Sequence, residues 1–410
     1  MWKERYTVLF ILFITWVVSY LDRMVMTVAI PYIAIDFNLS PMAMGVVIST
    51  FFAGYALFQI PGGILADKFG ARKVMASGIA WWSIFTFGTG LVNSLQPMLL
   101  LRFFFGVGEG IFPASSWKTI ANWFPVKERA TANGFMMSSN FLGPALAPLF
   151  VVAVMSAWGW RSVFYSLIVP GILITLLIWF FVKDNPQESA RVSAQELAEI
   201  RGNEPVGSAV VSNTITFSDV LKSRVAWQCF LTWFCFDITF WGFMSWIPTY
   251  LIKERGFEMV KMGITASVPF FAGTIGLILG GYISDKLFRN NRKLLVVIGN
   301  LLGAFFLYIT YSASTDTILP IMTLAGLFIG IAFGAIWGLP MNVMPKEVMG
   351  AASGFINMAG QIAGFISPMV IGYLVQVSGN FQSAFLFLVA GATFSAIVAA
   401  TIQQKKTVSE

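Results

Sequence analysis

Histidine is absent from this chain of 410 residues, and cysteine occurs only twice, at Cys229 and Cys235. The lack of histidine excludes imidazole metal ligands and histidine-based proton relays. Two cysteines in one apolar stretch are too few for a disulfide framework, so we expect buried free thiols. The sequence also contains no nucleotide-binding loop and no nucleophile–base pair. It therefore predicts neither an enzyme nor a metal or cofactor site.

Charged residues are scarce as well. Only 11% of the residues are Asp, Glu, Lys or Arg, whereas a soluble protein carries about 25%. Hydrophobic residues make up 57%, and the mean hydropathy is +0.77. This composition excludes a soluble globular domain. It predicts an integral membrane protein whose partner is the lipid bilayer.

Apolar runs long enough to cross a bilayer recur along the whole chain. A membrane-spanning helix needs about 20 predominantly apolar residues. By that rule we predict an all-α protein with twelve spans, at 7–30, 41–65, 74–95, 97–121, 131–154, 161–183, 225–251, 260–283, 294–313, 317–340, 351–376 and 382–402.

Basic residues are distributed unevenly between the two sides of the predicted membrane. Of the 26 Lys and Arg residues, two lie inside spans and 20 lie on the side that both termini share. The other four lie on the opposite side: Arg161, Lys253, Arg255 and Lys261. The positive-inside rule predicts a multi-pass protein of the inner or plasma membrane with both termini in the cytoplasm. The net charge of +7 reflects this topology and indicates no nucleic-acid partner.

Two loop sequences of the first half recur in the second. GGILADKFGARK at 62–73 resembles GGYISDKLFRNNRK at 280–293. FPVKERATANGF resembles MPKEVMGAASGF, with Pro125 corresponding to Pro345. The two repeats have nearly the same offset along the chain, which predicts duplicated six-span halves with a substrate site near the midplane. We expect them at 1–183 and 225–410, joined by a polar cytoplasmic linker at 184–224 and followed by a short cytoplasmic tail.

The first repeated loop resembles the signature of the major facilitator superfamily, which implies the major facilitator fold. Its glycines permit a tight turn, and its charged residues can form alternative salt bridges as two halves rock. The resemblance implies that these residues switch the conformation and do not contact the substrate. They are Gly63, Asp67, Lys68, Gly70, Arg72 and Lys73, with Asp285 in the second copy.

Four charged residues lie deep inside two predicted spans: Asp22 and Arg23 in 7–30, and Arg102 and Glu109 in 97–121. One charge at a bilayer centre costs about 2.5–3.5 kcal/mol on insertion scales. Seven residues are nearly two helical turns, so Arg102 and Glu109 face the same way. If the two spans are adjacent, two acids and two bases balance, and protonating one acid frees an arginine for an incoming anion. The alternative is a static ion-pair cluster that holds helices together.

The segment LRFFFGVGEGIFPASSWKTIANWFPVKERA resembles the anion:cation symporter family, as do SYLDR, FFAGYALFQIPGG and FINMAGQIAGFISPMVIGYL. That family includes bacterial sugar-acid transporters and vesicular glutamate and sialic acid carriers. The resemblance implies that Arg102 holds a substrate carboxylate, that Asp22 and Glu109 carry protons, and that Arg23 couples them. It also implies further substrate contacts at Tyr55, Asn140, Trp337 and Gln361.

Asp237 and Trp241, in the predicted span 225–251, depart from the sugar-acid branch, which has Asn and Tyr at about these positions. Trp241 remains a candidate substrate contact. Asp237 could repel an anion, bind a further proton or recognise an ammonium or hydroxyl group. It could also be protonated or paired near the outer end of its span, without a role in transport.

The sequence thus predicts a proton-coupled importer of an organic anion, working as a monomer by alternating access. A sugar acid such as an aldonate, hexuronate or aldarate is the expected substrate. One alternative is a proton-coupled antiporter that exports drugs or metabolites, since Gly143 and Pro144 partly resemble an antiporter signature. A nutrient sensor is a second alternative, although such proteins append a long signalling domain.

Overall fold

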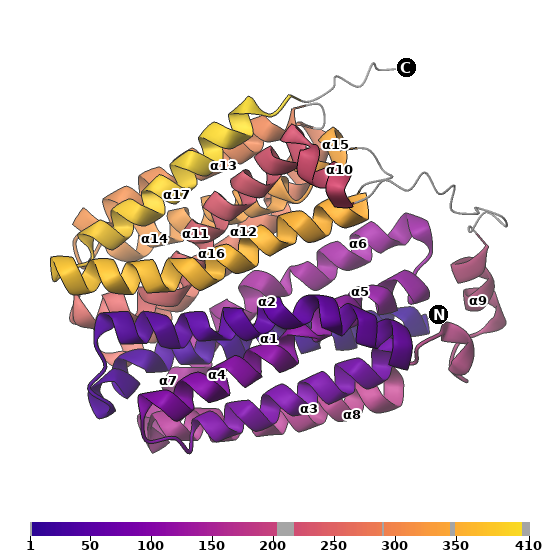
Figure 1. The fold of residues 1–410 in the computed structure, drawn as a ribbon, viewed down its shortest axis with the longest axis horizontal. Coiled ribbons are helices and arrows are strands. Elements are labelled where there is room, and N and C mark those ends of the chain that lie inside the picture. The colour runs from indigo at the N-terminus through magenta and orange to yellow at the C-terminus, as the bar shows by residue number, and fades with distance from the viewer. Residues whose placement is uncertain (1, 203–216, 289–290, 345–348, 404–410) are drawn as a thin grey trace. The chain divides into compact units, whose positions relative to one another are not determined.

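The computed structural model describes residues 2–202, 217–288, 291–344 and 349–403, and every regular element among them is a helix (Figure 1). Helices suit a membrane because each satisfies its own backbone N–H and C=O groups without water. The prediction of an all-α protein is confirmed. Part of the predicted linker, 203–216, and the repeated Pro345 lie outside the described residues.

The helices before the linker are α1 (Glu4–Asp36), α2 (Pro41–Phe69), α3 (Ala71–Thr89), α4 (Leu95–Gly110), α5 (Phe112–Trp123), α6 (Val126–Met137), α7 (Ser139–Ser166), α8 (Ile168–Phe181) and α9 (Ala194–Arg201). Those after it are α10 (Phe217–Lys222), α11 (Arg224–Lys253), α12 (Met259–Lys286), α13 (Arg292–Ser312), α14 (Ile318–Ile336), α15 (Leu339–Val343), α16 (Met349–Ser378) and α17 (Gln382–Thr401).

Ten helical stretches in the described chain are long and apolar enough to cross a membrane. One of them, Val126–Phe181, holds two predicted spans, because the backbone breaks at Gly159 with a φ of 78°. The helix α3 is not among the ten, because Arg72 and Lys73 in its first turn lower its mean hydropathy. With α3 included, every predicted span coincides with a helix. The protein is a multi-pass membrane protein.

By the density of internal contacts the chain divides into two compact units. The first unit comprises Met1–Met26, Thr50–Gly143 and Ala153–Val211, and the second comprises Thr27–Ser49, Pro144–Val152 and Ser212–Glu410. The second unit thus includes two short segments that come before the linker. The units therefore differ from the predicted halves, which stay a prediction.

Within the second unit, the segments 27–49 and 144–152 pack on the helices that follow the linker. A Cβ atom added to Gly45 of α2 would meet the carbonyl oxygen of Pro368 on α16. A Cβ atom added to Gly263 of α12 would meet the side chain of Val152. Close backbone approach of this kind needs glycine. We call these contacts the seam of the second unit.

Three glycine contacts between α2 and α4 in the first unit recur between α12 and α14 in the second. A Cβ atom on Gly110 would meet the carbonyl oxygen of Tyr55, and one on Gly330 would meet that of Gly273. The positions correspond at nearly the same offset as the repeated loops. The other contacts recur in the same way: Gly106 with Phe51 and Gly326 with Pro269, then Gly62 with Ile111 and Gly280 with Ile331.

A fourth contact recurs between other helices. Gly143 of α7 lies against Tyr20 of α1, and Gly360 of α16 lies against Asp237 of α11. The number of residues that separates Gly143 from Gly360 is the same as the number that separates Tyr20 from Asp237. The backbone arrangement is therefore repeated, and residues of α1 and α4 that lie in the first unit can be matched to residues of α11 and α14 in the second.

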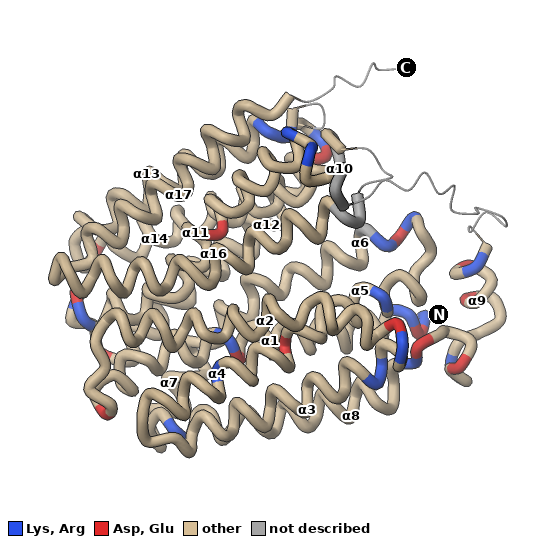
Figure 2. The backbone as a smooth tube through the Cα atoms, viewed as in Figure 1, with Lys and Arg blue, Asp and Glu red and all other residues tan. Residues whose placement is uncertain are grey.

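The helix α9 holds the start of α1 in the first unit, where charged residues gather (Figure 2). The carboxylate of Glu196 accepts hydrogen bonds from the backbone N–H groups of Glu4 and Arg5, at 3.0 and 2.9 Å. Arg5 also pairs with Glu199 at 3.2 Å and with Glu128 at 3.1 Å. A carboxylate at this helix end satisfies free N–H groups and complements the helix dipole.

Candidate functional site

Arg23 of α1 and Glu109 of α4 form an ion pair inside the first unit, with Nε of Arg23 donating to Oε2 of Glu109. Both side chains are buried, and Glu109 has no exposed surface (0%). Burying a charge without a partner is costly in a medium of low dielectric constant. The pair shows that α1 and α4 bring their charged residues together.

Asp22 and Arg102 complete this buried set, and we call the four side chains the charge quartet: Asp22, Arg23, Arg102 and Glu109. Asp22 is 2% exposed and Arg102 is 3% exposed. Asp22 lies within electrostatic reach of both Glu109 and Arg102. In the described chain, however, neither Asp22 nor Arg102 forms an ion pair, and Oδ1 of Asp22 and Nε of Arg102 lack hydrogen-bond partners.

Aromatic rings surround both guanidinium groups of the quartet. Arg23 lies over Tyr55 and Tyr20, at 4.6 and 4.7 Å from the ring centroids. Arg102 lies over Phe105 at 4.6 Å, and Phe51 contacts both arginines at 5.1 and 5.5 Å. Ring faces attract cations, more strongly where water is excluded. These rings stabilise the arginines without neutralising them, so the positive charge remains available to an anion.

Of these rings, only Tyr55 was a predicted site residue. Tyr20 and Phe105 each lie three residues from an arginine of the quartet on the same helix. That spacing places them on the same helix face, and it is the signal that could have identified them. Phe51 lies on a different helix, and only the tertiary contact reveals it.

Further polar atoms in the first unit are buried and have no hydrogen-bond partner among the described residues. Asn140, a predicted site residue on α7, is one of them through its Oδ1 atom. Atoms of two quartet members, Nη2 of Arg23 and Oε1 of Glu109, are others. Buried polar groups are normally bonded, so unpartnered ones indicate places where a ligand, a proton or water binds. Ser19 and Trp82 belong to this set as well.

The remaining predicted substrate contacts lie in the second unit. Trp241 is on α11, Trp337 directly follows α14, and Gln361 is on α16. Gln361 and Trp241 are buried, and Nε1 of Trp337 and Oε1 of Gln361 lack partners within the described chain. Asp237 lies at the middle of α11. The alternative that placed it near the outer end of its span is therefore wrong about its position.

The residues of the predicted switch loop make contacts that the sequence did not specify. Asp67 pairs with Lys118 of α5 at 2.7 Å. The backbone N–H of Arg72 donates to Asp184 at 2.8 Å, where Gly70 has a φ of 91° that favours glycine. In the second unit Asp285 pairs with Arg292 at 2.7 Å. The other loop residues lie at the end of α2 and the start of α3: Gly63, Lys68 and Lys73.

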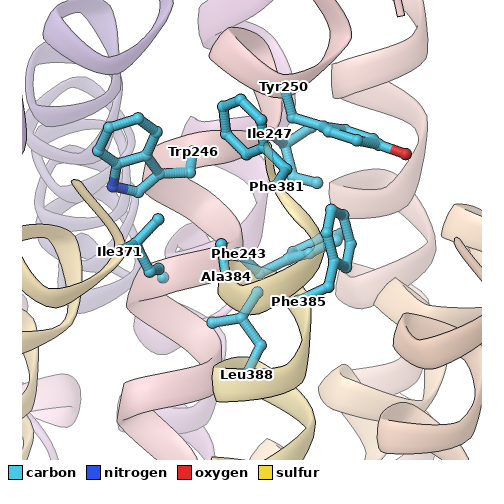
Figure 3. A pocket seen from close by; sticks show the side chains of 10 residues that line it. Phe243, Trp246, Ile247, Tyr250, Ile371, Phe381, Ala384, Phe385 and Leu388 are labelled. Carbon is cyan, nitrogen blue, oxygen red and sulfur yellow. The ribbon is translucent and has the colours of Figure 1, made fainter. Parts of the chain in front are cut away.

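Two hollows lie away from the quartet. Figure 3 shows one, lined by residues of α11, α16 and α17 such as Phe243, Ile371 and Leu388, with the Tyr250 hydroxyl directed away from it. It offers about 10 Å³, hardly enough for one water molecule. The other, of about 280 Å³, lies between α3 and α8, and its lining residues are uncharged. Neither has a charged group that could hold an anion.

No cluster of three or more Cys, Asp or Glu side chains in the described chain could hold a metal ion. Cys229 and Cys235 are both free thiols. Within the quartet, charge is paired between side chains, Arg23 with Glu109.

Comparison with known proteins identifies relatives along nearly the whole chain. The family model of the Major Facilitator Superfamily matches residues 12–368. The "Probable galactarate/D-glucarate transporter GarP" of Escherichia coli strain K12 is 35% identical over 408 residues, covering 94% of this chain and 91% of the relative. The "Probable sulfoacetate transporter SauU" of Cupriavidus necator is 33% identical over 392 residues, covering 94% and 90%.

Solved structures show a similar fold. The crystal structure of a bacterial homolog of the human lysosomal transporter Spinster, inward-facing and unoccupied, matches with a TM-score of 0.80. The match covers 98% of this chain and 96% of that chain at 21% sequence identity. At this identity the likeness establishes the fold alone.

Proposed function

Because the chain belongs to the Major Facilitator Superfamily and is a transporter rather than an enzyme, we propose that it is a proton-coupled symporter that imports an organic anion by alternating access. The observation that carries this proposal is the charge quartet of the first unit. Two acids and two bases are buried together, yet among the described residues only one acid and one base of the four form an ion pair.

The charge balance of the quartet links anion binding to proton binding. With both acids ionised, the four side chains sum to zero net charge. Protonating Asp22 or Glu109 leaves one positive charge in excess, and an anion that binds Arg102 restores neutrality. The guanidinium group binds carboxylate through two parallel hydrogen bonds, which suits Arg102 to this role. Arg23 transmits the change, because its partner Glu109 is one of the two proton carriers.

The seam of the second unit supports a cycle between two conformations. With both termini in the cytoplasm, the segments 27–49 and 144–152 form the outer ends of α1, α2 and α7. Their contacts with α12 and α16 then close the outer side, as at Gly45 and Pro368. Opening this seam would admit protons and the anion from outside. The switch pair Asp67–Lys118 would hold the opposite side in alternate states.

Sugar acids are the substrate class that we propose, namely an aldonate, a hexuronate or an aldarate. The relatives are named as transporters of galactarate, D-glucarate and sulfoacetate, all of which are organic acids. An acid group is their common feature, and Arg102 is the residue that would bind it. Tyr55, Asn140, Trp337, Gln361 and Trp241 would contact the rest of the molecule.

The setting that we propose is the inner membrane of a bacterium, since the relatives above are bacterial proteins. Both termini would lie in the cytoplasm. The transporter would act as a monomer, since each chain carries a complete quartet.

One observation favours a second candidate function, an exporter of cationic compounds in exchange for protons. Asp237 is a buried carboxylate, and no Lys or Arg pairs with it in the described chain. Such a residue attracts cations. Arg102 opposes this reading, because it would repel them.

Thermal stability of the purified protein in detergent tests the proposal. The ligand panel would contain aldonates, hexuronates, aldarates, small dicarboxylates and lipophilic cations, each at pH 5.5 and 7.5. A ligand that binds only the folded state raises the melting temperature by mass action. We expect stabilisation by one class of acid, stronger at the lower pH and lost in Arg102→Ala. Stabilisation by cations alone, dependent on Asp237, would replace the proposal with the exporter.

A further inference from the structure

Asp237 is a carboxylate without a counter-charge among the described residues of the second unit. It is 4% exposed and lies near the middle of α11, whose basic residues Arg224 and Lys253 are at the two ends. At a rise of about 1.5 Å per residue, each of them is roughly 20 Å or more away along the helix. The long helices packed on α11 are α12, α16 and α17, and none carries an acidic or basic residue between its terminal turns. Two short helices also contact α11: α15 has no charged residue, and α10 directly precedes the Arg224 end. A charge buried in this way needs compensation from a proton or from a ligand.

Aromatic rings occupy the surroundings of this carboxylate. Trp233, one turn earlier on α11, places its indole N–H beside this carboxylate. A Cβ atom added to Gly360 would meet Oδ2 of Asp237 and would lie 2.9 Å from Nε1 of Trp233. The ring of Trp233 meets Trp337 edge to face at a centroid distance of 4.6 Å, and Phe333 lies 5.9 Å away. Indole N–H is a donor only, so its place suits an ionised carboxylate. Rings beside an acid form the kind of site that recognises ammonium groups.

One buried polar atom in these surroundings has no hydrogen-bond partner within the described chain. It is Nε1 of Trp337, whose ring meets the ring of Trp233. This atom donates hydrogen bonds, whereas the carboxylate of Asp237 accepts them. A ligand that fits both groups offers N–H groups to Asp237 and a hydroxyl or carbonyl oxygen to Trp337.

We propose that Asp237, Trp233 and Trp337 bind an ammonium group of the transported acid. The inference rests on the proposed import of an organic acid and narrows its substrate to an acid that also carries an amino group. A second carboxylate, as in an aldarate, would be repelled by Asp237. A hydroxyl group alone would leave the charge of Asp237 uncompensated. An amino-substituted hydroxy acid meets every requirement of the site.

Matched pairs of acids test the proposal on the whole protein in detergent. One pair is D-gluconate with 2-amino-2-deoxy-D-gluconate, and the other is 4-hydroxybutyrate with 4-aminobutyrate. Within each pair only a hydroxyl group is exchanged for an ammonium group. Affinities would be measured from the rise in melting temperature with ligand concentration, in the wild type, Asp237→Asn and Asp316→Asn. The last variant removes an exposed carboxylate of the same unit and serves as the matched control.

The wild type and the control should bind the ammonium acid of at least one pair about tenfold more tightly than its hydroxy partner, a difference of about 1.4 kcal/mol. In Asp237→Asn the preference should fall to within about twofold of unity, since the amide has no charge to offer. Equal binding of both members by the wild type would overturn the proposal. A preference that survives in Asp237→Asn would overturn it as well.

Two further variants separate this inference from the proposed function. Arg102→Lys should weaken both members of each pair alike, because it acts on the carboxylate that they share. If no acid binds at all, the proposed function fails, and this inference fails with it. Trp233→Phe keeps the charge of Asp237 but removes the indole N–H group beside it, so it remains informative if Asp237→Asn does not fold. An unchanged ammonium preference in Trp233→Phe would contradict the proposed geometry.

Discussion

The two units repeat the same helix–helix contacts but differ in which buried positions carry charged residues. The glycine contacts of the first unit recur in the second, where Asp237 corresponds to Tyr20 and Gly330 to Gly110. By the same correspondence, the counterparts of the charge quartet are all buried and none is charged: Thr239, Phe240, Met322 and Ile329. The frame alone therefore does not determine the chemistry of the site. The charge quartet is the reason that we propose proton and anion binding in the first unit.

At one other position the charged residue belongs to the second unit and the uncharged one to the first. Tyr20 of the first unit is an aromatic residue beside charged groups, and its counterpart Asp237 is a charged group beside aromatic residues. Trp16 stacks on Tyr20 with 5.8 Å between the ring centroids, and its counterpart Trp233 lies beside Asp237. On the two proposals above, a duplicated scaffold would recognise two different chemical groups, an acid in one unit and an ammonium group in the other.

The largest effect that we expect distinguishes Arg102 from its counterpart Met322. Arg102→Lys keeps the positive charge but loses the planar fork that binds carboxylate at two points. Binding of the stabilising acid should weaken on the order of 100-fold, whereas Met322→Leu should stay within about twofold. Titrating the melting temperature against acid concentration measures both values. Equal affinities in the two variants would remove Arg102 from the site.

Introducing a Glu and an Arg at the second-unit counterparts of Glu109 and Arg23 tests whether these positions meet as they do in the first unit. Ile329→Glu alone should cost about 2.5–3.5 kcal/mol, because it buries a charge without a partner. Phe240→Arg supplies the counterpart of Arg23, so the double variant should recover about 1 kcal/mol or more of that loss. The yield of monodisperse protein and its melting temperature provide the readout. Losses that simply add would show that the two positions do not meet as Arg23 and Glu109 do.

Glycine substitutions sharpen the same comparison with a smaller effect. Gly110→Ala and Gly330→Ala should lower the melting temperature by similar amounts, because each new Cβ atom would meet a backbone carbonyl oxygen. Gly281→Ala is the matched control, since nothing lies within 4 Å of a Cβ atom added there. Alanine at an unobstructed helical position stabilises by up to about 1 kcal/mol. A large loss for only one of the two test variants would contradict the repeated frame.

The smallest effect concerns the starts of α1 and α11. The hydrogen bond from Lys3 holds the pKa of Glu199 below its ordinary value of 4.5. Its contribution to stability is therefore present at neutral pH and is lost as the pH falls through that lowered pKa. Glu199→Gln should lower the melting temperature slightly at pH 7, and the difference should vanish in strong acid. A difference in melting temperature between the wild type and Glu199→Gln that grew in acid would contradict a stabilising contact of the ionised Glu199.

The helix α11 provides the contrast, because an uncharged hydroxyl caps its first turn. Ser223 accepts a hydrogen bond from the backbone N–H of Ala226 at 3.3 Å. Ser223→Ala should cost about 1 kcal/mol, with little dependence on pH in the acidic range. Melting curves at three pH values separate the two behaviours.

Apolar runs made the helices predictable, since a bilayer demands about 20 such residues in each span. The charges of the quartet were equally visible, because an ionisable residue within such a run is rare and costly. Asp237 was visible for the same reason, but its aromatic surroundings were not. Trp233 and Phe333 lie on different helices, and their contact depends on how α11 and α14 pack.

Interactions between distant polar residues could not be predicted from sequence. Glu196 caps α1, which begins far earlier in the chain, and Lys118 reaches Asp67 from another helix. Each is an ordinary charged residue near a helix end, and many alternative partners would be equally acceptable. Only the tertiary structure selects among them. A short helix was expected within the predicted linker 184–224, where α9 lies, but its contact with the start of α1 was likewise not visible in the sequence.

The central claim is that the charge quartet couples an acid to protons, and uptake into proteoliposomes tests it most directly. The acid that stabilises the purified protein would be supplied outside, with and without an inward proton gradient, to the wild type and Glu109→Gln. The account predicts accumulation in the wild type only when the gradient is present. Glu109→Gln should fail to accumulate the acid under the gradient while still exchanging labelled for unlabelled acid. Equal uptake with and without the gradient, or gradient-driven accumulation by Glu109→Gln, would contradict it.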